Sequence, residues 1–489
     1  MEIKCKVGTL PTFERVFNAA VTKEGTAEVT IPDAMPDVSE LLLTDGQSLI
    51  RGKDVHGGGL TVSGISELTV LFRTEDEKTE RISIDVPFEA EAGCSTDDDS
   101  RAIASVHLTS AEARVLSARR ILVRAEVCVT ISLWTPAELR WLENAAAENC
   151  GAELRRKCVR LVPVVSVEEK TFVSEDVQPL PAGKPPVGSV LYSRAILRPE
   201  SAEPVGGKLV VRGNASVSAI YETSAGEIAQ AELSQFWSGF IDLPEAGEGL
   251  SFDTVTALTG CSVESDGGGF RISVGGVVQA VIRRREELEM IVDAYGTDCS
   301  LVPTIETMIV DVEAVPEITA DAVSIHLESL RRPRALVCIS ADCGRPRQEK
   351  ESVRVPVTVK ALCVMEDGKH ELLTGRGEAI CSGCGSIPEV SCGELYASVA
   401  SPGADVRAPV CFAQTRYRRE EIRYLSAIEA KNSAILKGGP SVTILRAAPG
   451  DSVWSLGKAR GLPCASVRAY NDLSEEEEPT PGSLLLLAK

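Results

Sequence analysis

The residues best suited to chemistry in this sequence are cysteines in its C-terminal third. Cys381 and Cys384 form a Cys-Ser-Gly-Cys motif, and Cys392 follows shortly after it. Thiolates at this spacing can share a tetrahedral zinc ion, but a closed structural site needs four ligands. The residues that could complete it are Cys343, Cys363 and His370. The motif is therefore a weak metal candidate. A turn with free thiols is the simpler interpretation, and thiol exchange that cross-links an assembly is a further alternative.

Other reactive groups lack the spacing that catalysis needs. The four histidines lie far apart and in no recognisable catalytic motif: His56, His107, His326 and His370. No GxxxxGK[ST] phosphate-binding motif is present, and residues 375–377 lack the third glycine of a dinucleotide fingerprint. Acidic runs at 97–99 and 475–478 follow no pattern that places a carboxylate in an apolar pocket, so we expect solvated loops. The sequence predicts no enzyme, no catalytic residue and no cofactor.

Composition narrows the classes of partner. The 489 residues include 51 Lys and Arg against 71 Asp and Glu, a formal net charge of -20, which argues against binding to nucleic acid or an anionic membrane. No apolar run approaches the roughly 18 residues that span a bilayer, and the N-terminus does not resemble a secretory signal. We therefore expect a cytoplasmic protein with no membrane span, whose 15 cysteines are mostly reduced thiols.

Long alternating runs recur along the chain at a fixed offset. Residues 60–72 and 209–221 both alternate along an extended strand and share a glycine at the same place, 149 positions apart. The run at 121–133 maps onto 270–282 with the same offset. Two separated strand patterns with one offset predict the duplication of a β-domain.

The repeats predict the domain organisation. The first copy covers residues 1–150 and the second covers 151–298. A third, divergent copy at 299–428 is indicated by the strand-like run at 357–369 and by Arg-Arg-Glu-Glu at 418–421, which also occurs at 284–287. Because long paired strands with one apolar face must pack in layers, we expect a mainly β fold of tandem β-sandwich-like domains.

The end of the chain follows a different pattern. Residues 429–440 predict a linker that ends in Gly-Gly-Pro, and residues 441–489 predict a small unit. Its expected elements are a strand at 442–446, a helix capped by Asp451 or Ser452 and ended by Gly461, a second helix at 465–470 and a strand at 484–487. Because so small a unit must bury its large side chains, we expect Trp454 and Leu456 in its core.

This strand-helix-helix-strand order resembles a LysM domain. The matching residues are Pro449 to Ser452, Trp454 to Leu456, Lys458, Gly461, Asn471, Pro481, Gly482 and Leu484. Domains of this kind bind N-acetylglucosamine polymers in a shallow groove between the loop after the first strand and the loop before the last. The groove residues that the resemblance implies are Gly450, Asp451, Ser452, Asn471, Asp472, Leu473, Pro481 and Gly482.

The whole arrangement resembles SipL-type spore-coat morphogenetic proteins, in which DUF3794 β-domains precede a C-terminal LysM domain. The residues that resemble this β-domain are Pro36-Asp37-Val38, the strand blocks that begin at Leu60 and Leu209, and Asp293-Ala294-Tyr295. The resemblance implies a non-enzymatic scaffold or adaptor in spore coat assembly, on the mother-cell side of the forespore surface. Its LysM domain would recruit a spore-coat morphogenetic protein, the coat-basement ATPase, and other coat proteins could pair with the β-domains. The alternative is a LysM protein that binds peptidoglycan or another N-acetylglucosamine glycan.

Overall fold

Strands dominate the structure. A computed structural model describes residues 3–147, 151–243, 249–431 and 441–488. Most of these residues lie in strands, so the predicted mainly β fold is confirmed. The reason is visible in β4 (Thr79–Gly93), where exposed and buried positions alternate from Ser83 to Gly93, as a strand with one apolar face requires.

The strands follow one another in three consecutive sets. The first set contains β1 (Ile3–Thr30), β2 (Val38–His56), β3 (Gly59–Thr74), β4, β5 (Arg101–Ser117) and β6 (Arg120–Ala147). The second contains β7 (Ala152–Leu161), β8 (Val164–Gln178), β9 (Val187–Val205), β10 (Lys208–Thr223), β11 (Ile228–Asp242), β12 (Leu250–Asp266), β13 (Gly269–Arg284) and β14 (Glu286–Gly296). The third contains β15 (Ser300–Leu327), β16 (Pro333–Cys343), β17 (Arg347–Glu349), β18 (Ser352–Met365), β19 (His370–Ser382), β20 (Glu389–Cys392), β21 (Tyr396–Val399) and β22 (Ala404–Lys431).

The three sets share one order of strand pairing. In the first set β6 lies between β1 and β5, and β3 lies between β2 and β4. In the second set β13 lies between β8 and β12, β10 lies between β9 and β11, and β7 pairs with β14. In the third set β22 pairs with β15, β20 and β21, while β18 pairs with β16, β17 and β19. Each set therefore forms two layers of antiparallel sheet.

An apolar core lies between the two layers of each set. In the second set the rings of Tyr221 and Phe270, from opposite layers, meet edge to face with their centroids 5.6 Å apart. Phe72 in the first core and Phe412 in the third are completely buried. Because apolar area removed from water stabilises a fold by roughly 25 cal/mol per Å², these cores hold the layers together.

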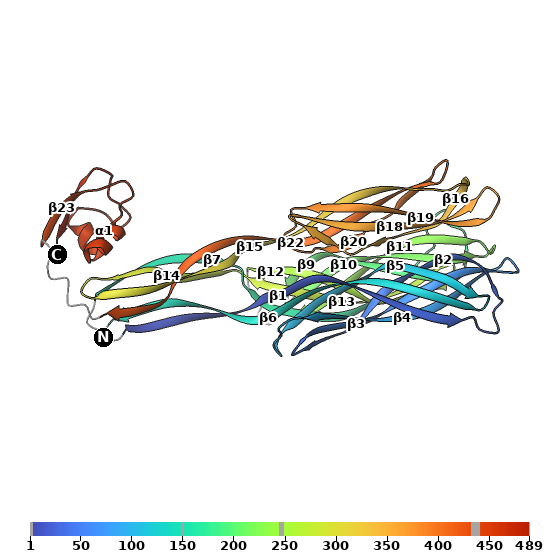
Figure 1. The fold of residues 1–489 in the computed structure, drawn as a ribbon, viewed down its shortest axis with the longest axis horizontal. Coiled ribbons are helices and arrows are strands. Elements are labelled where there is room, and N and C mark those ends of the chain that lie inside the picture. The colour runs from blue at the N-terminus through green and yellow to red at the C-terminus, as the bar shows by residue number, and fades with distance from the viewer. Residues whose placement is uncertain (1–2, 148–150, 244–248, 432–440, 489) are drawn as a thin grey trace.

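Paired strands from each set extend beyond these layers and form a narrow stalk. Figure 1 shows paired strands of all three sets extending side by side toward the end where the C-terminal unit lies: the β1–β6 pair, the β7–β14 pair and the β15–β22 pair. Leu142, Ile291 and Leu425 meet inside the stalk in one apolar cluster. They are separated by 149 and 134 positions, which are the offsets at which the strand patterns recur in the sequence.

The last strand of the stalk runs into the predicted linker. Lys431 pairs with Ser300 and Glu429 pairs with Val302, so residues 429–431 belong to β22 and the third set extends beyond residue 428. These residues continue the strand because β15 offers them a partner in register. The rest of the predicted linker, 432–440, lies outside the described residues. In the part of the chain that the structure describes, no helix is long and apolar enough to cross a membrane.

Candidate functional site

The C-terminal unit contains the only helices among the described residues. Its elements are β23 (Val442–Arg446), α1 (Val453–Arg460), α2 (Cys464–Ala469) and β24 (Leu484–Ala488), and β23 and β24 pair antiparallel. The two helices pack on the inner face of this ribbon through a small core of Val453, Leu462, Val467 and Leu487. This unit presents the loops in which the predicted groove residues lie.

The predicted caps of α1 are confirmed. The Ser452 hydroxyl accepts a hydrogen bond from the Ser455 amide at 3.0 Å, and the Ser455 hydroxyl accepts one from the Ser452 amide at 2.8 Å. Gly461 ends the helix in the left-handed conformation, with φ of 62°. Asp451 takes another role, because its carboxylate accepts a hydrogen bond from the Ala448 amide at 2.8 Å and fixes the turn before the helix.

Asn471 holds the unit together. Its side-chain amide donates to the backbone oxygens of Val467 and Leu486 at 2.7 and 2.8 Å, and its side-chain oxygen accepts from the Leu486 amide at 2.6 Å. These bonds tie the end of α2 to β24, and they use the side-chain donor and acceptor that a ligand would need. Asn471 is thus a structural residue of this loop.

The other predicted groove residues lie at two separate loops. Gly450 is exposed on the loop before α1, with φ of 92°, and Pro481 and Gly482 are exposed before β24. Asp472 is exposed in the left-handed conformation, whereas Leu473 is half-buried against the small core. The exposed members can contact a ligand, but they offer few polar side chains for a sugar.

Glu478 links the two loops. Its carboxylate accepts a hydrogen bond from the Val453 amide, the first amide of α1, at 2.7 Å. It also forms an ion pair with Arg468 at 3.4 Å, while Arg468 donates to the Ser474 oxygen at 2.6 Å. Glu478 is exposed, as expected for this acidic run, and in addition it binds the first turn of α1, because a helix N-terminus favours a negative charge.

The unit docks on the end of the stalk through Trp454. The indole nitrogen of Trp454 donates to the Asp293 carboxylate at 2.8 Å, and Lys458 pairs with the same carboxylate at 2.5 Å. Burial alone would raise the pKa of Asp293, but the hydrogen bonds from Lys458 and Trp454 outweigh it and lower the pKa below its usual value. Tyr295 meets the Trp454 ring edge to face at 4.9 Å and donates to the Leu462 oxygen at 2.8 Å.

This contact corrects the expectation for Trp454. Leu456 is buried in the unit, as predicted, but Trp454 is only half-buried and faces the stalk. The unit fills its core with aliphatic residues, so the indole is free to contact Tyr295 and Asp293. These two residues belong to the Asp-Ala-Tyr triplet that the sequence singled out.

The outer face of the ribbon is apolar and open. Val442, Ile444 and Leu484 are 54%, 68% and 67% exposed, and the strand register places them together on the side that faces away from the helices. Arg446 lies opposite Leu484 at the end of this face. We call Val442, Ile444 and Leu484 the ribbon face. Sequence alternation in the two strands could have indicated it, because Leu445, Leu485 and Leu487 point inward.

The cysteines of the metal candidate are divided between two places. The sulfur atoms of Cys381 and Cys384 lie 2.9 Å apart, whereas Cys392 forms a hydrogen bond with Cys343. Among the described residues, no group of three or more His, Cys, Asp or Glu is arranged to hold a metal ion. Cys299 is disulfide-bonded, and the other described cysteines are free thiols. Burial raises the pKa of several of them to about 12, which makes them poor nucleophiles: Cys128, Cys261, Cys338 and Cys384.

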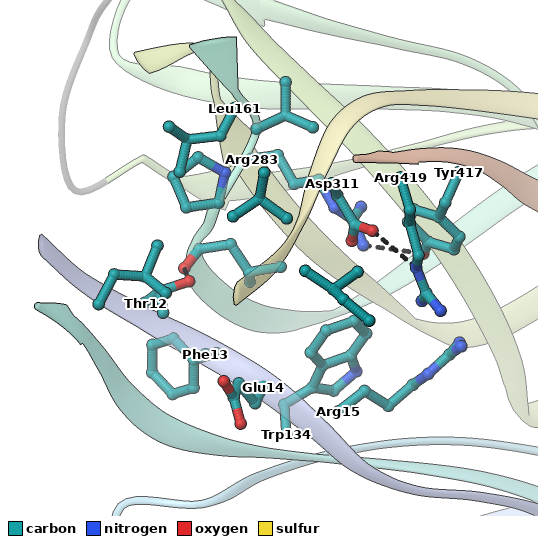
Figure 2. A pocket seen from close by; sticks show the side chains of 16 residues that line it. Thr12, Phe13, Glu14, Arg15, Trp134, Leu161, Arg283, Asp311, Tyr417 and Arg419 are labelled. Carbon is teal, nitrogen blue, oxygen red and sulfur yellow. Dashed lines mark hydrogen bonds and ion pairs between the residues drawn. The ribbon is translucent and has the colours of Figure 1, made fainter. Parts of the chain in front are cut away.

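A cavity of about 390 Å³ lies where the stalk joins the wide part of the molecule, and Figure 2 shows the side chains that line it. Arg283, 1% exposed, lies between the rings of Trp134 and Tyr417, with its guanidinium carbon 5.7 and 5.0 Å from their centroids. It donates to the Tyr417 hydroxyl at 2.8 Å and forms an ion pair with Asp253. Because the arginine is paired and stacked, it stabilises this junction.

The comparisons with known proteins give no match. No family model, no curated protein and no solved structure matches this chain.

Proposed function

We propose that the protein is a non-enzymatic scaffold in spore coat assembly. It is built from three copies of one β-sandwich domain and a terminal LysM domain. The LysM domain recruits a spore-coat morphogenetic protein, for which the resemblance implies the coat-basement ATPase. The protein acts in the cytoplasm, on the mother-cell side of the forespore surface.

Two features support three related domains. The three sets share one order of strand pairing, and residues at the offsets of 149 and 134 meet in space. Leu142, Ile291 and Leu425 do so in the stalk, and Trp134, Arg283 and Tyr417 do so at the junction. Copies of one domain that assemble side by side bring equivalent residues together, which random strand patterns would not do.

The observation that carries the proposal is the ribbon face. A small domain gains stability from each large side chain it buries, yet this one leaves Ile444 and Leu484 about two-thirds exposed on one face. Contiguous exposed apolar residues mark a site of protein contact. In the neighbouring groove, Glu478 and Asn471 already use polar groups that a glycan would bind. Protein recruitment therefore suits the unit better than the alternative of N-acetylglucosamine binding.

An affinity purification tests the proposal. Tagged full-length protein from sporulating cells should retain the coat ATPase, and Ile444→Asp combined with Leu484→Asp should reduce its retention by about tenfold or more. Ile309→Asp is the matched control, because Ile309 is 70% exposed on β15 of the stalk, and it should retain the partner. In parallel, titration with an N-acetylglucosamine hexamer should show no binding. Binding of the hexamer without retention of any coat protein would favour the glycan alternative.

A further inference from the structure

A cavity of about 480 Å³ lies in the wide part of the molecule, where the three sets of strands meet. The first set contributes β2 and β5, the second β9 and β12, and the third β16, β20 and β22. Most of the wall is apolar, and the residues that give it this character are Val106, Leu108, Leu197, Val255, Leu258 and Val390. This volume is within the range of small-molecule sites.

One wall of the cavity carries the carboxyl group of Glu389, which has few bonding partners in the protein. Glu389 accepts a hydrogen bond from the Ser105 hydroxyl, and among the described residues it has no ion pair. Burial raises its pKa to about 7 and the Ser105 hydrogen bond opposes this, with no contribution from a cationic side chain. A carboxyl group with one hydrogen bond and no ion pair is expensive to hold in apolar surroundings, so this one indicates a site for a further hydrogen-bond donor or a cation.

A second polar side chain lines the same cavity. His107 follows Ser105 by two residues on β5, so both side chains lie on one face of the strand. Burial lowers the pKa of His107 to about 4, although hydrogen bonds to the backbone of Gly344 and Cys343 act in the opposite direction. The imidazole is therefore neutral, and its buried Nε2 has no partner. Buried polar atoms are normally hydrogen-bonded, so an unpartnered ring nitrogen in the same cavity wall as a carboxyl group with one hydrogen bond is unusual.

Arg198 determines which part of the cavity a charged ligand group can occupy. Its guanidinium donates to the Ser216 hydroxyl at 3.0 Å and to the Cys392 oxygen, but its Nε is buried and unpartnered. Cys392 lies three residues beyond Glu389 on β20, about 10 Å along the strand, so the guanidinium that binds the Cys392 oxygen is at the other end of this strand from the carboxyl group. Its charge repels a positive ligand group from that part of the cavity.

We propose that this cavity binds a small amphipathic primary amine. The ammonium group donates to the Glu389 carboxylate, and the apolar body of the ligand lies against the aliphatic wall. Arg198 excludes the opposite orientation. Each of the three domains contributes part of the wall, so the ligand stabilises their association.

A titration of the full-length protein with three probes of equal chain length tests the proposal. Hexylamine should bind at least tenfold more tightly than hexan-1-ol, and hexanoate should not bind measurably. Glu389→Gln should remove the preference for the amine and leave the binding of hexan-1-ol unchanged. Glu394→Gln is the matched control, since Glu394 is an exposed acid shortly after β20, and it should behave like the wild type.

Two results would overturn the proposal. Equal affinity of the wild-type protein for hexylamine and hexan-1-ol would show that the cavity has no amine site. No binding of hexylamine at millimolar concentration would show that water alone occupies it. Both are measured on the wild-type protein, so a variant that fails to fold does not affect them. Ser105→Ala, which alters only the partner of Glu389, provides a second variant and should change the ratio of amine to alcohol affinity by several-fold.

Discussion

Residues separated by the repeat offset meet both in the stalk and in the wide part of the molecule, but their contacts are apolar in the stalk and charged in the wide part. In the stalk, Leu142, Ile291 and Leu425 form an apolar cluster. In the wide part, Asp45, Arg194 and Asp342 meet, 149 and 148 positions apart in sequence. An apolar cluster is equally stable whichever set contributes each of its similar side chains. A charged one requires the arginine to lie between the two acids, so it favours a single arrangement of the three sets.

Lys360 completes the charged centre. Its ammonium donates to the backbone oxygens of Thr44 and Ala111 at 3.0 and 2.9 Å and lies 3.9 Å from Asp342. Burial would raise the pKa of Asp45, but the charges of Arg194 and Lys360 outweigh it and lower the pKa. Burial raises the pKa of Asp342, although the charges of Arg194 and Lys360 oppose this. Two acids and two cations thus meet in the interior, and removal of one member leaves the others without part of their pairing.

The largest expected effect on stability comes from the removal of one member of this charged centre. Arg194→Met leaves Asp45 and Asp342 buried without their main partner, and should reduce the free energy of unfolding by about 3–5 kcal/mol. Urea denaturation measures it. Arg212→Met is the control, because Arg212 pairs with Glu203 at 3.5 Å on the surface and should change stability by less than about 0.5 kcal/mol. Equal effects of both variants would show that the charged centre does not order the three sets.

A cavity created in the stalk by shortening a buried side chain should have the next largest effect on stability. Ile291 is fully buried between strands of different sets, so Ile291→Ala should destabilise the protein by about 2–4 kcal/mol. The effect should be independent of salt, because no charge is removed. Ile309→Ala, at an exposed stalk position, is the control. If the loss at Ile291 is within experimental error of the control, the stalk does not hold the sets together.

The wide part should also respond to pH through Glu389. Its pKa is about 7 in the folded protein and about 4.5 in the unfolded chain, so the folded state binds the extra proton between these values. Stability should therefore fall as the pH rises from 4.5 to 7, by at most about 3 kcal/mol. Glu389→Gln should remove this slope when urea denaturation is repeated at pH 5 and pH 8. A slope that persists in the variant would assign it to another group.

Local signals in the sequence predicted local features well. Alternation identified the long strands, and Asp451 or Ser452 together with Gly461 identified both ends of α1. The features that were missed depend on residues brought together from far along the chain. Nothing near Glu478 in the sequence indicates that it reaches the first amide of α1.

Because local signals do not show contacts between residues far apart in sequence, they predicted neither the central clusters nor the docked position of Trp454. The offset of 149 relates Asp45 to Arg194, but it does not say that corresponding residues touch. Trp454 was expected in a core because the unit is small, and its true partner lies 161 positions earlier in the chain. Glu389 carried no signal, because the four-residue strand β20 is too short to show a pattern. LysM identity and coat function stay predictions.

The smallest effect should come from the contact between the stalk and the C-terminal unit, where partly exposed polar bonds replace a buried core. Trp454→Phe keeps the ring contact with Tyr295 but removes the hydrogen bond to Asp293, and should weaken docking by about 1 kcal/mol. Hydrogen exchange of the α1 amides should then be faster, while the amides of β13 in the wide part exchange as before. Because Lys458 also pairs with Asp293, added salt should speed exchange of α1 in the wild type as well. A variant whose α1 amides exchange at the wild-type rate would show that the unit does not depend on this hydrogen bond for its position. The ribbon face would then be presented to a partner independently of the stalk.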